Sequence, residues 1–185
     1  MILSKNFSFS ELPFKIIWSA LFLTFIGLIT LYSISQHHQG PILLNPFKKQ
    51  LLFLIPALLI CFLIICIPRY SIHKYSYAFY FIGIIIVVLP FFNTSHAGTY
   101  RWLDFGLPFT IQPSEFAKVF TVIALARYLS DNTLRMKRFT SIIIPIFFAF
   151  IPTFIVMNQP DLGTSIVMMA PVLPMLYWAG AKPFY

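Results

Sequence analysis

Long apolar stretches separated by short polar connectors make up almost the whole chain. A helix that crosses the hydrocarbon core of a bilayer needs about 20 mostly apolar residues. Six stretches approach this length, at about 14–34, 50–67, 75–92, 113–129, 141–157 and 162–179. The pattern predicts an all-α integral membrane protein: a polytopic transmembrane helix bundle of about six spans that forms a single domain over residues 1–185.

Composition supports the same fold class. The chain is 59% hydrophobic and only 10% charged, whereas a soluble domain carries about 25% charged residues. The net charge of +8 does not indicate nucleic-acid binding, because the basic residues lie between apolar segments rather than along a polar face. That arrangement is typical of signals that orient spanning helices.

The basic residues also predict the orientation of the chain, because cytoplasmic connectors carry an excess of Lys and Arg. With the N-terminus in the cytoplasm, Lys48, Lys49 and Arg101 lie outside and Lys118 lies within a span. Most basic residues then lie inside, namely Lys5, Lys15, Arg69, Lys74, Arg127, Arg135, Lys137, Arg138 and Lys182. We therefore expect a multi-pass protein with a cytoplasmic N-terminus.

Charged residues gather in one outward-facing connector, at residues 98–112, and in the helix start that follows it. Arg101, Asp104, Glu115 and Lys118 lie here, although the chain has only 5 acidic residues. Charged side chains near the apolar core cost free energy, so they are usually paired or functional. The cluster marks either ion pairs that stabilise the fold or a ligand site.

The segment Gln112-Pro113-Ser114-Glu115 has the pattern of a helix start. Proline is favoured at the first helical position, which makes Gln112 the cap residue and Glu115 the third helical residue. A carboxylate at this position complements the positive end of the helix. Lys118 follows three residues later on the same face, so a Glu115–Lys118 ion pair is expected.

The segment 158–164 repeats this pattern, since a Gln-Pro pair precedes Asp161, which we expect near the second helical position. Two outward-facing helix starts can converge at the bilayer edge, and helix N-termini bind anions through their free N–H groups. Arg101 and Lys118 add positive charge, so a phosphate or pyrophosphate headgroup would fit. The carboxylates would then balance the two cations or hold a divalent cation that bridges to the phosphate.

No other side chains suggest a known chemistry. Cys61 and Cys66 share one apolar run without disulfide or metal-site spacing. We find no Ser–His–Asp arrangement and no phosphate-binding glycine loop. All four histidines are expected in solvated connectors, namely His37, His38, His73 and His96.

Two motifs strongly resemble those of the SEDS family (shape, elongation, division and sporulation). The first comprises residues 101–106, Arg-Trp-Leu-Asp-Phe-Gly, and residues 112–118, Gln-Pro-Ser-Glu-Phe-Ala-Lys; the second is residues 159–164, Gln-Pro-Asp-Leu-Gly-Thr. Thr99 stands where the family usually has alanine, a minor departure. The resemblance extends over essentially the whole chain and is stronger to the elongation branch of the family than to its division branch.

The resemblance implies a peptidoglycan glycosyltransferase of cell elongation and cell-shape control, which polymerises lipid II at the outer face of the bacterial inner membrane. The 4-hydroxyl of one lipid-linked disaccharide attacks the anomeric carbon of the growing chain, and undecaprenyl pyrophosphate leaves. By resemblance, Arg101, Glu115, Lys118 and Asp161 line or shape the substrate cavity. The implied partners are lipid II, a class B penicillin-binding transpeptidase and the elongation machinery. The resemblance implies no certain cofactor. The divalent cation considered above, held by the carboxylates, is the one candidate cofactor.

One departure from the family concerns catalysis. Family members have about ten spans, and their catalytic aspartate lies in a later outward loop without a counterpart here. Neither Asp104 nor Asp161 matches it, so no catalytic residue is assigned. We therefore expect an incomplete, N-terminal half of the family fold that does not polymerise lipid II alone.

Alternatives of other kinds stay open. The chain could be a non-catalytic scaffold that binds lipid II or the elongation machinery, which binding without turnover would favour. It could also belong to the division branch, which rescue of septation rather than of cell shape would favour. A lipid transporter is less favoured, because no inverted halves are evident.

Overall fold

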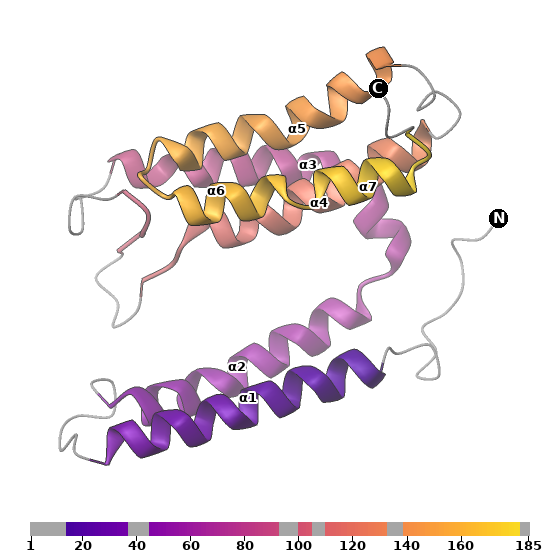
Figure 1. The fold of residues 1–185 in the computed structure, drawn as a ribbon. Helices are drawn as coiled ribbons and strands as arrows, with labels where there is room; N and C mark the ends of the chain where they lie inside the picture. The colour runs from indigo at the N-terminus through magenta and orange to yellow at the C-terminus, as the bar shows by residue number, and fades with distance from the viewer. Residues whose placement is uncertain (1–13, 37–44, 93–99, 105–109, 133–138, 182–185) are drawn as a thin grey trace. The chain divides into compact units, whose positions relative to one another are not determined.

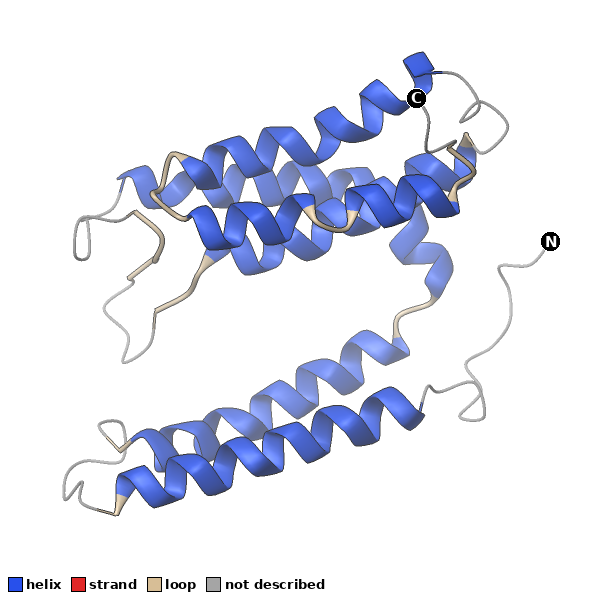
Figure 2. Cartoon of the chain, viewed as in Figure 1, coloured by secondary structure: helices blue, strands red, loops and turns tan. Residues whose placement is uncertain are grey.

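The computed structural model describes residues 14–36, 45–92, 100–104, 110–132 and 139–181. These residues are mainly helical (Figure 2), with one isolated antiparallel bridge between Leu103 and Ile111. The chain divides into two compact units, Met1–Tyr70 and Ser71–Tyr185, which are described separately.

The first unit is a pair of antiparallel helices, α1 (Phe14–Ser35) and α2 (Pro46–Cys66) (Figure 1). The Asn45 side chain caps α2 by accepting a hydrogen bond from the Lys48 N–H at 3.1 Å, and Pro46 occupies the first turn. The helix therefore begins four residues before the expected residue 50, because Asn followed by Pro is a favourable helix start. Most side chains of both helices are exposed, as expected for helices that face lipid.

The second unit contains the remaining helices and the site described below. They are α3 (Arg69–Val88), which starts in the first unit, the 3₁₀ helix η2 (Leu89–Phe92), α4 (Pro113–Asp131), α5 (Phe139–Met157), α6 (Leu162–Met169) and α7 (Val172–Trp178). Helices α6 and α7 run end to end (Figure 1) and correspond to the single helix expected at 162–179. That helix is interrupted at Ala170 and Pro171, because proline has no N–H for the helical ladder.

All six expected apolar stretches are helical, but they differ in length and polarity. Among the described residues, three segments are long and apolar enough to cross a membrane by length and composition: Phe14–Ser35, Pro46–Cys66 and Arg69–Phe92. Ile142–Met157 and Leu162–Trp178 are apolar but shorter. The fourth stretch, α4, is not in either group. It carries four charged side chains, Glu115, Lys118, Arg127 and Asp131.

Two clusters of buried apolar residues hold the second unit together. One joins α4, α5 and α7 through Leu125, Leu129, Ala149, Val172 and Leu176. The other joins α3, α4, α5 and α6 through Val87, Ala117, Val156 and Met168. The second cluster includes Ala117, two residues after Glu115 in α4, so it forms an apolar base close to the polar start of that helix.

Arg127 anchors the opposite end of this unit. Its guanidinium donates hydrogen bonds to the carbonyl oxygens of His73 and Lys74, both at 2.8 Å, and lies 4.5 Å from the ring centre of Tyr77. His73 itself is in α3 and lies 3.7 Å from an oxygen of Asp131. The expectation that His73 lies in a solvated connector is therefore wrong.

The other histidines, His37, His38 and His96, lie outside the described residues. Cys61 and Cys66 are free thiols on exposed positions of α2.

Candidate functional site

The first half of the site is the start of α4. Gln112 is the N-cap, Pro113 occupies the first turn and Glu115 lies in the same turn, which confirms the expected helix start. The Glu115 N–H donates to the Gln112 carbonyl oxygen at 3.2 Å. The Gln112 side chain makes no capping hydrogen bond to its own helix, so its amide is available to another element.

The second half is the start of α6. Asp161 was expected near the second helical position, but in the structure it is the N-cap of this helix. Its Oδ1 accepts a hydrogen bond from the Thr164 N–H at 3.2 Å, and its Oδ2 accepts one from the Thr164 hydroxyl at 2.8 Å. The Ser165 hydroxyl donates to the Asp161 carbonyl oxygen at 2.7 Å. The helix begins at Leu162, the first residue of the expected stretch 162–179, and Asp161 lies just before it because a short carboxylate side chain is well placed to cap the third amide.

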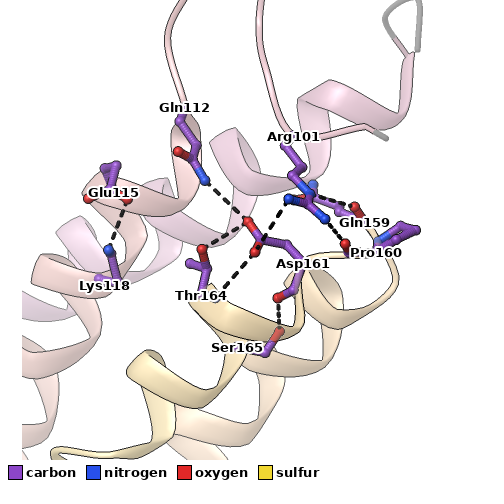
Figure 3. Close-up of polar contacts among 9 residues, drawn as sticks. All are labelled: Arg101, Gln112, Glu115, Lys118, Gln159, Pro160, Asp161, Thr164 and Ser165. Atoms are coloured by element: carbon purple, nitrogen blue, oxygen red, sulfur yellow. Dashed lines mark hydrogen bonds and ion pairs between the residues drawn. The ribbon is translucent and has the colours of Figure 1, made fainter. Parts of the chain in front are cut away.

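The two helix starts meet, an arrangement that the sequence allowed without requiring it. Gln112 Nε2 donates to Asp161 Oδ2 at 3.2 Å, and an Arg101 guanidinium nitrogen lies 3.8 Å from Asp161 Oδ1 (Figure 3). The Asp161 side chain is only 9% exposed. A carboxylate this deeply buried needs compensation, which the guanidinium, the amide and the Thr164 donors supply.

Arg101 also contacts the backbone just before Asp161. Its guanidinium donates to the carbonyl oxygen of Gln159 at 3.4 Å and to that of Pro160. The connector that carries Arg101 is held beside α4 by paired backbone hydrogen bonds between Leu103 and Ile111, at 2.8 and 3.0 Å. Arg101 therefore links the connector before α4 to the turn before α6.

Glu115 and Lys118 form the predicted ion pair, with 2.9 Å between Lys118 Nζ and Glu115 Oε1. The Glu115 side chain is 56% exposed and that of Lys118 is 25% exposed. Figure 3 shows the pair near Gln112, on the same helix start. The structure thus groups the four predicted site residues as two ion pairs, Arg101 with Asp161 and Lys118 with Glu115. Asp104 is exposed and follows Leu103 of the bridge.

The described residues do not provide a ligand set for the divalent cation considered above. They contain no group of three or more His, Cys, Asp or Glu side chains placed to hold a metal ion. Both Asp161 oxygens already accept hydrogen bonds, from Gln112 and Thr164. Within this part of the chain the carboxylate is organised around donors and a guanidinium.

Sequence reasoning missed one residue of this region. Gln159, read only as part of a motif, is 2% exposed and donates from Nε2 to the Val87 carbonyl oxygen at 2.6 Å. The available signal was Pro90, which has no N–H to offer a nearby carbonyl of α3. Spacing alone could not reveal that a side chain 72 positions away meets this carbonyl.

Comparison with known proteins identifies the family. The family described as "Cell cycle protein", which groups FtsW, RodA and SpoVE, matches residues 14–185. The chain belongs to this family. It is the SEDS family that the motifs resemble, and its members are membrane proteins.

Several curated members of this family are similar to the chain over most of the chain's length. A probable peptidoglycan glycosyltransferase FtsW of Aeromonas salmonicida is 33% identical over 168 residues, which are 88% of this chain and 42% of the relative. Stage V sporulation protein E of Bacillus subtilis is 32% identical over 172 residues, 88% of this chain and 46% of the relative. The peptidoglycan glycosyltransferase RodA of Treponema pallidum is 28% identical over 177 residues, 92% of this chain and 39% of the relative. The chain thus spans less than half the length of these relatives, and they do not separate the elongation branch from the division branch.

Solved structures support the fold. The crystal structure of the rod-shape-determining protein RodA of Thermus thermophilus is similar with a TM-score of 0.73 and 22% identity, over 89% of this chain and 54% of that one. A chain of a peptidoglycan synthase complex that coordinates polymerization and crosslinking is similar with a TM-score of 0.73 and 22% identity, over 88% of this chain and 47% of that one. The helix arrangement of this family is therefore present.

Proposed function

We propose that this chain forms the part of a lipid II polymerase that holds the pyrophosphate-linked headgroup at the outer face of the inner membrane. The observation that carries the proposal is the contact between the two helix starts, in which the Gln112 amide donates to the Asp161 carboxylate. The curated relatives named as peptidoglycan glycosyltransferases support the reaction class.

The charges of the two ion pairs suit a pyrophosphate. Two helix N-termini contribute partial positive charge, and Arg101 and Lys118 contribute full positive charge. In the structure Asp161 and Glu115 balance these cations. We propose that Arg101 and Lys118 bind the phosphates, while Asp161 and Glu115 hold the two cations in place until the headgroup arrives.

Neither Asp104 nor Asp161 is proposed as the general base for glycosyl transfer. Asp161 is buried, caps α6 and pairs with Arg101, so its lone pairs are already engaged. The proposed role of these residues is to bind and orient the lipid-linked substrate, with deprotonation of the sugar hydroxyl assigned to a carboxylate outside them. A non-catalytic scaffold that binds lipid II is the second candidate, which the engagement of Asp161 also favours.

We further propose the bacterial inner membrane and a cytoplasmic N-terminus. The site and the Arg127 contacts lie at opposite ends of α4, which supports the proposal that they face opposite sides of the membrane. Several basic residues that support this orientation, namely Lys5, Arg135, Lys137, Arg138 and Lys182, lie outside the described residues. Alkaline phosphatase fused after Asp104 should be active and the same fusion after Asn132 inactive; the reverse pattern would show the opposite topology.

A binding assay tests the proposed function. The chain in lipid nanodiscs should bind lipid II and undecaprenyl pyrophosphate, but not undecaprenol, because the phosphates are the recognised group. Equal binding of all three would show that only the lipid tail is recognised. The same preparation with labelled lipid II tests the expectation that the chain does not polymerise lipid II alone, and long glycan products would overturn that expectation.

The branch and the partner are separate proposals. We propose the elongation branch, with a class B penicillin-binding transpeptidase as partner. Expressed as part of a full-length family protein, the chain should restore cell shape and not septation in cells depleted of their own elongation or division enzyme. Restored septation alone would place the chain in the division branch.

A further inference from the structure

Gln159 links the end of α3 to the turn before α6. Its side chain is buried, and Nε2 donates to the Val87 carbonyl oxygen at 2.6 Å. Its own carbonyl oxygen accepts a hydrogen bond from Arg101 at 3.4 Å. One residue therefore joins the apolar base of the second unit to the Arg101 guanidinium.

The Val87 carbonyl needs this side chain because of Pro90. In a 3₁₀ turn such as Leu89–Phe92, each N–H donates to the carbonyl three residues earlier. The residue three positions after Val87 is Pro90, which has no N–H. Val87 is fully buried, so an unpaired carbonyl there would cost free energy. The Gln159 amide takes the place of the missing backbone donor.

This bond fixes the position of the Gln159–Pro160 backbone. Both carbonyl oxygens of that pair accept hydrogen bonds from Arg101, and the next residue is Asp161, its ionic partner. A shift of the turn would therefore move both acceptors and the carboxylate relative to Arg101. Small displacements matter here, because a misplacement of about 1 Å can cost a hundredfold in rate.

We propose that Gln159 is a positioning residue: by bonding to the Val87 carbonyl, it sets the Arg101–Asp161 pair for the phosphates of the lipid-linked substrate. The inference rests on the proposed headgroup site and adds a residue that does not touch the substrate. Pro90 contributes to this arrangement, because its lack of an N–H leaves the Val87 carbonyl available to Gln159.

The principal variant is Gln159→Met, which keeps a similar length and removes the donor. In nanodiscs it should bind undecaprenyl pyrophosphate roughly tenfold more weakly, within the range expected from a small displacement. Hydrogen exchange at the Leu103 amide should also quicken, because Arg101 no longer holds its connector against the turn. The matched control is Tyr80→Phe, which removes the hydrogen bond from the buried Tyr80 hydroxyl to the Phe148 carbonyl at 2.9 Å, outside the site. The control should change neither binding nor exchange at Leu103.

A second variant separates position from stability. Pro90→Ala supplies an N–H that can bond to the Val87 carbonyl, so adding it to Gln159→Met should restore thermal stability while binding stays weak. If binding returns together with stability, Gln159 acts only through the stability of the bundle and the inference is wrong. Unchanged binding and unchanged Leu103 exchange in Gln159→Met would also overturn it.

The headgroup proposal itself fails by a different result. If the parental chain does not bind undecaprenyl pyrophosphate, the proposed function is wrong. The exchange measurement at Leu103 then still decides whether Gln159 positions Arg101, because it needs no ligand.

Discussion

Gln112 and Asp161 lie 49 positions apart, and the side-chain amide of the first donates to the carboxylate of the second at 3.2 Å. Each residue is also the N-cap of its own helix, α4 for Gln112 and α6 for Asp161. The contact brings two helix N-termini together, and Arg101 joins them through its ion pair with Asp161. This contact therefore concentrates hydrogen-bond donors and positive charge at one end of the second unit.

Replacing Asp161 should separate its capping role from its charge. Asp161→Ala removes the cap of α6, which costs about 1 kcal/mol, and also leaves Arg101 without its carboxylate. Asp161→Asn keeps one capping oxygen but loses the charge and one of the two oxygens that accept hydrogen bonds from Gln112 and Thr164, so it should unfold at a temperature between those of the alanine variant and the parent. Thermal unfolding in detergent measures the difference. Equal destabilisation by the two variants would mean that the charge and the second acceptor oxygen, and not the cap, dominate.

Arg101 should be required for headgroup binding and not for folding. Arg101→Ala should weaken lipid II binding and leave the helical content of the bundle unchanged. Arg101→Lys should restore little, because a lysine ammonium cannot reproduce the planar set of guanidinium donors that contacts two carbonyls and a carboxylate. Equilibrium binding to nanodiscs, followed by circular dichroism on the same samples, tests both parts. Parental affinity in Arg101→Ala would reduce Arg101 to a surface charge.

The predictable part of this structure is what local patterns encode. Apolar length placed the helices, and the Gln-Pro-acid pattern placed the start of α4 and the Glu115–Lys118 pair, whereas it put Asp161 inside α6 and not at its N-cap. The contacts across the sequence had weaker signals: Gln112 to Asp161 was expected only as a convergence, and Gln159 to Val87 was not expected at all. Such contacts depend on how far one helix slides along another, which buried packing decides and residue spacing does not.

The contacts of Arg127 should stabilise the other end of the second unit without serving the site. Arg127→Ala removes two hydrogen bonds to carbonyls of α3 and the contact with the Tyr77 ring, so the free energy of unfolding should fall by about 2 kcal/mol. Lipid II binding by the folded fraction should stay at the parental value, since Arg127 lies at the opposite end of α4 from Glu115. Chemical denaturation in mixed micelles, paired with the binding assay, tests this. Loss of binding at full stability would show that the two ends are coupled.

Gly83 should be needed for the close approach of α3 and α4. A Cβ at this position would lie 3.2 Å from Phe120 Cδ2 and 3.4 Å from Ala117 Cα, and the latter is backbone that cannot easily move. Small residues at helix contacts let membrane helices pack closely. Gly83→Leu should therefore lower the free energy of unfolding by about 1–3 kcal/mol through overpacking.

The matched control for Gly83 is Gly27 of α1, where a Cβ would meet nothing within 4 Å. Gly27→Leu should leave stability unchanged or raise it by a few tenths of a kcal/mol up to about 1 kcal/mol, because leucine favours a helix more than glycine does. Gly83→Ala should lie between these extremes, since its gain in helix propensity opposes the displacement of the Phe120 ring. Thermal unfolding of all three variants in one detergent provides the comparison. If Gly83→Leu is as stable as Gly27→Leu, the α3–α4 contact is not limited by the size of residue 83, and close helix packing does not explain the glycine.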